Sequence, residues 1–199
     1  KILCSESRIR ALSFTGSTRV GRLLIEQSAN TVKRLSLELG GNAPFIVGPD
    51  MDPKQAAYAA VDAKFQTAGQ DCLAANRILV HESIHDEFVE QFAERMAALT
   101  VGNGLQGEID LGPLIHRQAV EKAAAIVDDA ISKGAKMIGG DQSQAPGENF
   151  FMPVMLTGVT PKMKVWREEN FAPVAGITAY STDDEVIEMA NDTEYGLSA

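Results

Sequence analysis

Hydrophobic positions along the chain alternate between the spacing of strands and the spacing of helices that cover a sheet. Short apolar runs at residues 9–14, 43–47 and 77–80 predict strands. Apolar residues recur every three or four positions over residues 84–99 and 120–131, as in amphipathic helices. This alternation predicts an α/β fold, a three-layer αβα arrangement with a largely parallel sheet.

Shorter elements complete the pattern. The strand at residues 9–14 is expected to be buried, and residues 32–39 alternate so that Leu35, Leu37 and Leu39 share one face of a strand. The other predicted elements are helices at residues 19–29, 53–66 and 183–190 and strands at residues 136–138, 154–156 and 174–180.

Composition and charge narrow the class of protein. The 199 residues are 45% hydrophobic and 23% charged, which is typical of a folded globular chain. The 18 basic and 27 acidic residues give a net charge of −9, so nucleic acid is not an expected partner. The chain has no apolar run of membrane-spanning length, so we expect no membrane partner and a cytoplasmic protein.

The two cysteines and the chain ends carry further information. Cys4 and Cys72 match no C-x-x-C or zinc spacing, so neither a disulfide scaffold nor a metal site is expected. The chain begins at Lys1 without Met and stops after a helical pattern at Ala199. Both ends look cut, so we expect a piece of a longer enzyme.

Two glycine-containing turns follow strands in the first part of the chain. Residues 14–17, Phe-Thr-Gly-Ser, stand where a strand passes into a helix, whose free N–H groups suit a pyrophosphate. Residues 38–42, Glu-Leu-Gly-Gly-Asn, place a carboxylate at a strand end before two glycines that permit close approach of a ligand. An ordinary glycine turn and a solvated edge residue are the alternative interpretations.

Two further motifs lie in the second part of the chain. Cys72 follows Gly69 and Gln70 on a loop between a helix and a strand, where a thiol can be accessible and activated. Residues 168–173, Glu-Glu-Asn-Phe-Ala-Pro, carry two acids and an aromatic ring before a proline that favours an extended segment. A buried structural cysteine and a polar loop with one anchoring ring are the alternatives.

Together, in this order and spacing, the four motifs closely resemble those of the aldehyde dehydrogenase superfamily. The matching segments are F-T-G-S at 14–17, L-E-L-G-G at 37–41, G-Q-x-C at 69–72 and E-E-x-F-x-P-V at 168–174. Residues 37–47 and 72–77 look most like the succinate-semialdehyde dehydrogenase branch. The resemblance covers the whole chain and implies that residues 1–40 end an NAD(P)-binding domain. Residues 41–199 would then form a catalytic domain of the aldehyde dehydrogenase type, truncated at its C-terminus.

The resemblance also implies a role for each motif. Cys72 would be the nucleophile and Glu38 the general base that activates water to hydrolyse a thioester on Cys72. NAD or NADP would be the cofactor and a small aldehyde, succinate semialdehyde, the substrate. The family implies a homodimer or homotetramer for the full-length enzyme. The implied cofactor-binding residues are Gly16, Ser17, Leu39, Glu169 and Phe171.

The chain departs from the family pattern at two positions. Ala172 stands where glycine commonly precedes the proline, a mild change that affects the loop expected under the nicotinamide ribose. Ala74 stands where some members have a second cysteine, so no disulfide with Cys72 can form there. The family supplies an oxyanion-binding Asn and a ribose-binding Lys upstream of residue 1, so we expect the 199-residue chain alone to be inactive.

Other functions remain open at this point. The chain could oxidise glutarate semialdehyde or a general aliphatic aldehyde, whereas a CoA-acylating relative would not need Glu38. A cysteine hydrolase would pair Cys72 with one of His81, His85 or His116, and a non-enzymatic assembly unit would need none of these residues. His81 and His85 are four positions apart, but no third metal ligand is apparent in the sequence.

Overall fold

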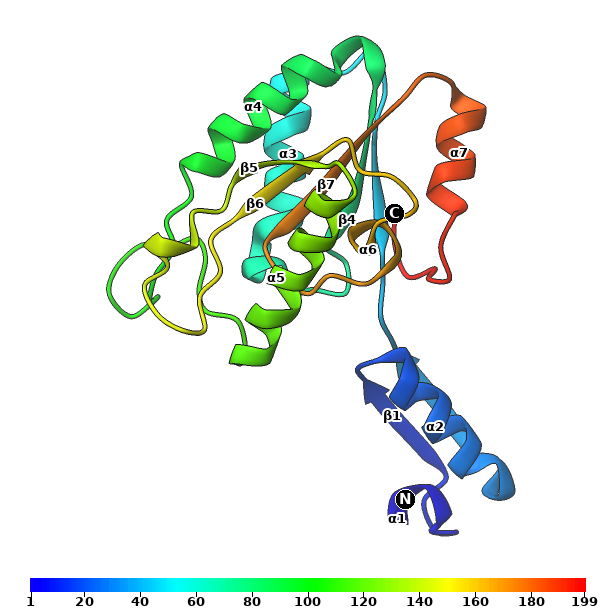
Figure 1. The fold of residues 1–199 in the computed structure, drawn as a ribbon. Coiled ribbons are helices and arrows are strands. Elements are labelled where there is room, and N and C mark those ends of the chain that lie inside the picture. The colour runs from blue at the N-terminus through cyan, green and yellow to red at the C-terminus, as the bar shows by residue number, and fades with distance from the viewer. The chain divides into compact units, whose positions relative to one another are not determined.

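The computed structural model describes residues 1–199, which divide into two units (Figure 1). The N-terminal unit is Lys1–Gly41 and the C-terminal unit is Asn42–Ala199. Each unit contains parallel strands connected through helices, as the alternating hydrophobic pattern predicts. None of the helices combines the length and the apolar character that a membrane span requires.

The N-terminal unit is a strand–helix–strand segment. Its elements are α1 (Ile2–Ser5), β1 (Ala11–Thr15), α2 (Thr18–Ser28), the 3-10 turn η1 (Ala29–Thr31) and β2 (Arg34–Glu38). The two strands are parallel, and Thr15 stands opposite Glu38 at their C-terminal ends. The side-chain oxygen of Ser17 accepts a hydrogen bond from the Val20 amide at 3.4 Å and so caps α2.

The first strand differs from the sequence prediction. It begins at Ala11 instead of residue 9, and its side chains alternate between exposed and half-buried positions. The expectation of a buried strand at residues 9–14 is therefore wrong. The physical reason is that β1 has a single paired neighbour, β2, in a sheet of two strands.

A five-stranded sheet forms the centre of the C-terminal unit. Its strands are β3 (Ala43–Val47), β4 (Ala75–His81), β5 (Lys136–Gly139), β6 (Val154–Thr157) and β7 (Val174–Tyr180). The order across the sheet is β3-β4-β7-β6-β5. All neighbours are parallel except β5 and β6, which are antiparallel. The largely parallel sheet is confirmed.

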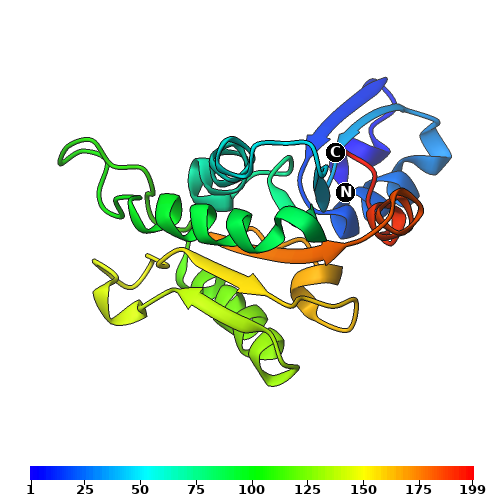
Figure 2. The ribbon, with the colours of Figure 1, turned by 90° about the horizontal axis from the view of Figure 1, so that it is seen from above.

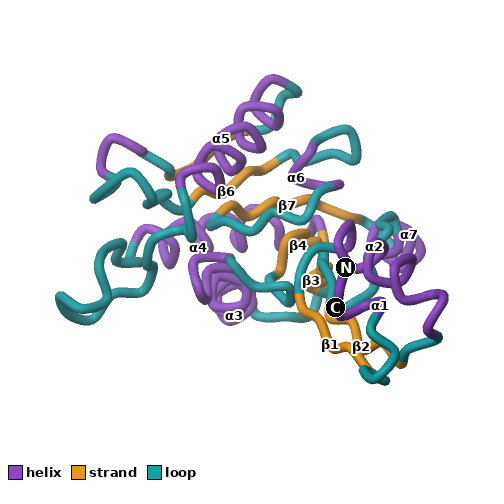
Figure 3. The backbone as a smooth tube through the Cα atoms, turned by 90° about the horizontal axis from the view of Figure 1, so that it is seen from below, coloured by secondary structure: helices purple, strands orange, loops and turns teal.

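Helices cover both faces of this sheet, as Figures 2 and 3 show. Helices α3 (Pro53–Phe65) and α4 (His85–Ala97) lie on one face, and α5 (Arg117–Ser132) lies on the other. The predicted three-layer αβα arrangement is therefore confirmed. The remaining helices and 3-10 turns are α6 (Lys164–Arg167), α7 (Asp183–Asn191), η2 (Gln66–Gly69), η3 (Glu82–Ile84) and η4 (Gln142–Gln144).

Aromatic side chains fix the end of α3 against α4. Phe88 and Phe92 lie one turn apart on α4 and are fully buried. The ring of Phe92 lies 5.9 Å from that of Phe65, the last residue of α3. Because the loop that carries Cys72 starts directly after Phe65, this packing holds the beginning of that loop.

The hydrophobic pattern missed the two shortest helices. Helix α1 and helix α6 each contain 4 residues. One helical turn is too short to show an amphipathic repeat, so the pattern carries no signal for either. Within α6, however, Val165 and Trp166 are almost completely buried and anchor the segment that leads to residues 168–173.

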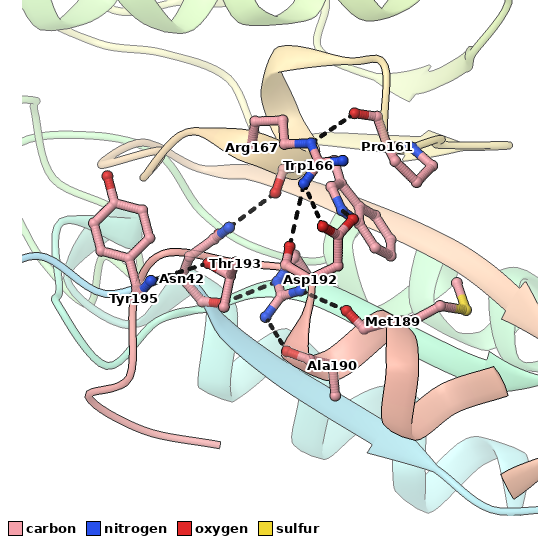
Figure 4. Close-up of polar contacts among 10 residues, drawn as sticks. Asn42, Pro161, Trp166, Arg167, Met189, Ala190, Asp192, Thr193 and Tyr195 are labelled. Carbon is pink, nitrogen blue, oxygen red and sulfur yellow. Dashed lines mark hydrogen bonds and ion pairs between the residues drawn. The ribbon is translucent and has the colours of Figure 1, made fainter. Parts of the chain in front are cut away.

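A buried guanidinium connects the start of the C-terminal unit with its end, and Figure 4 labels its acceptor residues Asn42, Met189 and Ala190. Arg77 on β4 donates hydrogen bonds to the carbonyl oxygens of Asn42 at 3.0 Å, Met189 at 2.8 Å and Ala190 at 2.8 Å. Its Cζ lies 5.5 Å from the ring centre of Trp166. The last turn of α7 is thereby attached to the sheet.

Candidate active site

Cys72 lies on the segment between α3 and β4, which includes η2 and which we call the thiol loop (residues 66–74). Its side chain is half-buried and its sulfur forms no disulfide. A second loop, residues 168–173, leads into β7, and we call it the carboxylate loop. Because β4 and β7 are parallel neighbours, the two loops reach the same edge of the sheet.

The thiol loop begins with three consecutive residues in the left-handed conformation. The φ angles are 53° at Thr67, 56° at Ala68 and 71° at Gly69. For a residue with a side chain, this conformation costs roughly 1–2 kcal/mol, and such strain is concentrated at functional sites. Neither Thr nor Ala favours the left-handed region, so no residue pattern indicates this turn.

Gly69 is in direct contact with the carboxylate loop. A Cβ atom at position 69 would lie 2.2 Å from the carbonyl oxygen of Ala172 and 2.6 Å from its carbonyl carbon. Only a residue without a side chain permits this approach of the two main chains. Ala172, which replaces the common glycine, is buried and is not among the residues with positive φ.

Gln70 attaches the thiol loop to a third segment. Its Oε1 accepts a hydrogen bond from the Ile115 amide at 2.9 Å, and its Nε2 donates to the Pro113 carbonyl oxygen at 3.3 Å. The side-chain amide therefore meets a main-chain donor and a main-chain acceptor before α5. This pairing explains why glutamine precedes the thiol in the loop.

The surroundings of Cys72 disfavour its ionised form. Burial raises the pKa of the Cys72 thiol, and the negative charges of Asp71 and Glu169 raise it further, Asp71 more than Glu169. The carboxylate of Asp71 also accepts a hydrogen bond from the Leu73 amide at 2.9 Å, which closes the turn around the thiol. A nucleophilic role for this thiol thus requires a base that removes its proton.

The carboxylate loop is held from both sides. The main-chain oxygen of Glu169 accepts a hydrogen bond from Lys122 of α5 at 3.1 Å. The buried Asn170 side chain donates to the Val174 carbonyl oxygen at 2.8 Å. Phe171 is 41% exposed. The loop thus presents a carboxylate and an aromatic ring from a fixed main chain.

A buried lysine lies beneath the two loops. Lys64, at 0% exposure, donates from Nζ to Asn76 Oδ1 at 2.7 Å and to both oxygens of Asn170 at 3.3 Å. Burial lowers the pKa of Lys64 to about 7, and the charge of Glu169 opposes that shift. No sequence motif identifies Lys64. The available signal was its spacing from the buried residues Ala57, Ala60 and Val61, which places it on the apolar face of α3.

In the N-terminal unit, the predicted residues gather at the ends of β1 and β2 and the start of α2. The Gly16 amide donates to the Glu38 carbonyl oxygen at 3.0 Å, and Ser17 caps α2. A Cβ atom at Gly21 would lie 2.6 Å from a methyl carbon of Leu39, so α2 packs closely on this side chain. The turn that the sequence suggested for a pyrophosphate is therefore a capped helix N-terminus.

The three histidines have local structural contacts. His81 and His116 accept hydrogen bonds from the amides of Ser83 and Ala119 and so cap η3 and α5. His85 Nδ1 lies 3.0 Å from Asp86 Oδ1. These contacts give each histidine a role near a helix start.

Comparison with known proteins decides the family. The sequence pattern of the Aldehyde dehydrogenase family matches residues 1–199. The chain belongs to this family. The superfamily resemblance seen in the four motifs is therefore confirmed, and so is the fold class, because the structural neighbours are aldehyde dehydrogenases.

Similar aldehyde dehydrogenases carry different substrate names. The chain is 83% identical over 199 residues to the non-phosphorylating aspartate-semialdehyde dehydrogenase of Halomonas elongata, covering 100% of this chain and 40% of that protein. It is 48% identical to the 3-sulfolactaldehyde dehydrogenase of Pseudomonas putida, covering 100% and 41%. The chain thus spans about two fifths of the length of these relatives.

A solved structure extends the similarity to the fold. The crystal structure of succinate-semialdehyde dehydrogenase from Burkholderia pseudomallei superposes with a TM-score of 0.95 at 46% sequence identity. The match covers 98% of this chain and 40% of that one. The named aldehydes of these relatives differ, so family membership alone leaves the substrate open.

The close approach of Gly69 to Ala172 predicts a large cost for a side chain at position 69. We expect Gly69→Ala to lower the free energy of unfolding by about 2–4 kcal/mol, because it combines left-handed strain with overpacking. Chemical denaturation measures this loss. Gly158→Ala is the matched control, because Gly158 has φ +69° and nothing within 4 Å of its Cβ position. Equal costs for both variants would contradict a steric contact between the loops.

The charge of Asp71 predicts a change in thiol ionisation. Removing the negative charge in Asp71→Asn favours the thiolate, so the pKa of Cys72 falls and alkylation reaches its half-maximal rate at a lower pH. The measurement is the rate of iodoacetamide modification of Cys72 against pH, followed by mass spectrometry to separate it from Cys4. Asp128→Asn, an exposed carboxylate on α5, serves as the control. An unchanged or higher midpoint in Asp71→Asn would contradict the electrostatic effect.

Proposed function

We propose that a full-length enzyme containing this chain oxidises a short semialdehyde to the carboxylic acid with a nicotinamide cofactor. The observation that carries the proposal is the contact between the thiol loop of Cys72 and the carboxylate loop of Glu169, in a chain of the aldehyde dehydrogenase family. This contact brings a nucleophile-bearing segment beside a segment suited to binding a ribose. Residues 1–40 would then be the end of the cofactor-binding domain and residues 41–199 most of the catalytic domain.

In the first step, Cys72 attacks the aldehyde. A bond forms between Sγ and the carbonyl carbon, and the carbonyl oxygen becomes an oxyanion that the Cys72 amide is suited to bind. Burial and Asp71 raise the pKa of the thiol, so its proton must pass to a base before or during the attack. This requirement supports the presence of a carboxylate base in the reaction.

The residues assigned to the cofactor match its chemical parts. Gly16 and Ser17 stand at the N-terminus of α2, where main-chain N–H groups and the helix dipole suit a pyrophosphate. Leu39 packs against α2, the Glu169 carboxylate suits ribose hydroxyl groups, and the exposed Phe171 ring suits a flat nicotinamide. When bound, the cofactor would accept the hydride that leaves the substrate carbon of the Cys72 adduct, so that the oxyanion becomes a carbonyl again, and NAD and NADP both fit this set.

In the last step, Glu38 acts as the general base for hydrolysis. The carboxylate takes a proton from water while the water oxygen attacks the carbonyl carbon bound to Cys72. The carbon–sulfur bond then breaks, the thiolate of Cys72 takes up the proton held by Glu38, and the carboxylic acid leaves. We expect no turnover from the 199-residue chain, because an oxyanion-binding Asn and a ribose-binding Lys are expected from other segments of the enzyme.

Aspartate semialdehyde is the substrate that we favour. The proposal rests on the 83% identical relative of that name and on the carboxylate of Asp71, which lies close enough to raise the pKa of Cys72. Aspartate semialdehyde carries an ammonium group that this carboxylate can attract, whereas succinate semialdehyde does not. Succinate semialdehyde is the second candidate, favoured by the motifs at residues 37–47 and 72–77 and by the solved relative.

The role of Cys72 predicts the effect of its removal. In the full-length enzyme, Cys72→Ala is expected to lower kcat with either semialdehyde by about 10³-fold or more, because the covalent step is lost. Formation of the reduced cofactor, measured by its absorbance with NAD and NADP in parallel, reports the rate. Cys4→Ala is the control and should retain activity. Activity that survives in Cys72→Ala would overturn the mechanism.

The proposed attraction between Asp71 and an ammonium group predicts that removing this carboxylate lowers kcat/KM selectively for aspartate semialdehyde. We expect Asp71→Asn to lower kcat/KM for aspartate semialdehyde by about tenfold relative to succinate semialdehyde, as for the loss of one ionic contact. The ratio of the two kcat/KM values is the measurement, because any change in the pKa of Cys72 acts on both substrates. An unchanged ratio would remove Asp71 from substrate recognition. A wild-type preference for succinate semialdehyde would favour the second candidate.

A further inference from the structure

Lys64 stands out because its burial is costly. An ammonium group that is fully removed from water is rare and requires hydrogen-bond acceptors for its protons. The structure provides three acceptors, which are Asn76 Oδ1 at 2.7 Å and the O and Oδ1 atoms of Asn170 at 3.3 Å. An apolar side chain of similar volume would fill the same space without the desolvation free energy that a buried amino group costs. The acceptors therefore indicate a task beyond filling the core.

One partner of Lys64 lies just beyond the thiol loop and the other lies within the carboxylate loop. Asn76 lies at the start of β4, which follows the thiol loop, and Asn170 lies within the carboxylate loop. Lys64 itself precedes Phe65 at the end of α3, directly before the left-handed turn. One ammonium group thus connects the entry and the exit of the thiol loop with the segment that carries Glu169.

The contact with Asn170 fixes the orientation of its peptide and side chain. Lys64 donates to the Asn170 main-chain oxygen and to Oδ1, which leaves the Asn170 Nδ2 group to donate to the Val174 carbonyl oxygen at 2.8 Å. Glu169 and Phe171 are the residues on either side of Asn170. A main chain fixed at Asn170 restricts the directions in which these two side chains leave the loop.

We propose that Lys64 is a positioning residue, whose buried amino group holds the carboxylate loop in the geometry that binds the cofactor. The inference rests on the proposed function, because it takes Glu169 and Phe171 as the cofactor-binding groups of that loop. Lys64 is proposed to contact neither substrate nor cofactor directly. It acts through Asn170 on one side and through Asn76 on the other.

The test compares cofactor binding with aldehyde binding in the full-length enzyme. We expect Lys64→Met to weaken binding of the reduced nicotinamide cofactor about tenfold while the KM for the aldehyde changes less than about twofold, because Asn170, which lies between the two proposed cofactor-binding residues of the carboxylate loop, loses its donor. The fluorescence of the bound reduced cofactor gives the dissociation constant without turnover. Asn76→Ala should act in the same direction, because it removes the nearest acceptor of Lys64.

Two control variants separate positioning from general destabilisation. Lys54→Met removes the same charge at an exposed position of α3, and Val61→Ala creates a cavity on the buried face of α3. Both should leave the cofactor dissociation constant within about twofold of the wild type, although Val61→Ala lowers the melting temperature. If Lys64→Met weakens cofactor binding no more than Val61→Ala does, the inference is overturned. If Lys64→Met does not fold, Asn76→Ala decides by the same comparison.

A third variant distinguishes this inference from the proposed function. Glu169→Gln should weaken cofactor binding if Glu169 binds the ribose. A loss in Lys64→Met without a loss in Glu169→Gln would overturn the role of Glu169 in the proposed function and keep the role of Lys64 in holding the loop. A loss in Glu169→Gln without a loss in Lys64→Met and Asn76→Ala would overturn the inference and leave the proposed function intact.

Discussion

The direct approach of two main chains at Gly69 and Ala172 is the constraint on which the rest of the site depends. The two segments are distant in sequence, but each enters one of two parallel neighbours, β4 and β7, at the same edge of the sheet. A Cβ atom at position 69 would lie 2.2 Å from the Ala172 carbonyl oxygen, which leaves no room for a side chain. The two loops therefore meet through their main chains. Contacts between backbones vary little when surrounding side chains change. The relation between the thiol and the carboxylate loop is therefore set by sheet topology together with a single glycine.

Several features of the site are unfavourable in conformational or electrostatic free energy. Three successive left-handed residues, a thiol whose pKa is raised and a fully buried lysine each oppose folding or ionisation. The structure offsets these costs with the aromatic packing of Phe65 and Phe92 and with the buried strands of the central sheet. The unfavourable backbone angles at residues 67–69 thus lie within a few residues of Cys72. Such departures from local folding preferences are expected at functional sites.

Hydrophobic spacing and local motifs predicted much of this structure, whereas contacts between distant residues lay beyond them. The period of the apolar residues gave α4, α5 and the strands, because each element buries one face. The burial of β1 was overestimated, because a run of apolar residues does not reveal how many strands flank it. The left-handed turn at Thr67 has no sequence signal, and Lys64 meets Asn170 across a separation of 106 residues. The roles of Cys72, Glu38 and Glu169 came from resemblance to a known family.

The guanidinium of Arg77 has a consequence for how this fold can diverge. It binds the carbonyl oxygens of Asn42, Met189 and Ala190, which every amino acid provides. The hydrogen bonds of Arg77 therefore do not depend on which side chains stand at positions 189 and 190. Position 77 does require arginine, because the three hydrogen bonds come from three nitrogens of one planar guanidinium, whereas lysine has a single ammonium nitrogen. The hydrogen bonds of Arg77 accordingly place no requirement on the side chains at positions 189 and 190, whereas they require a guanidinium at position 77.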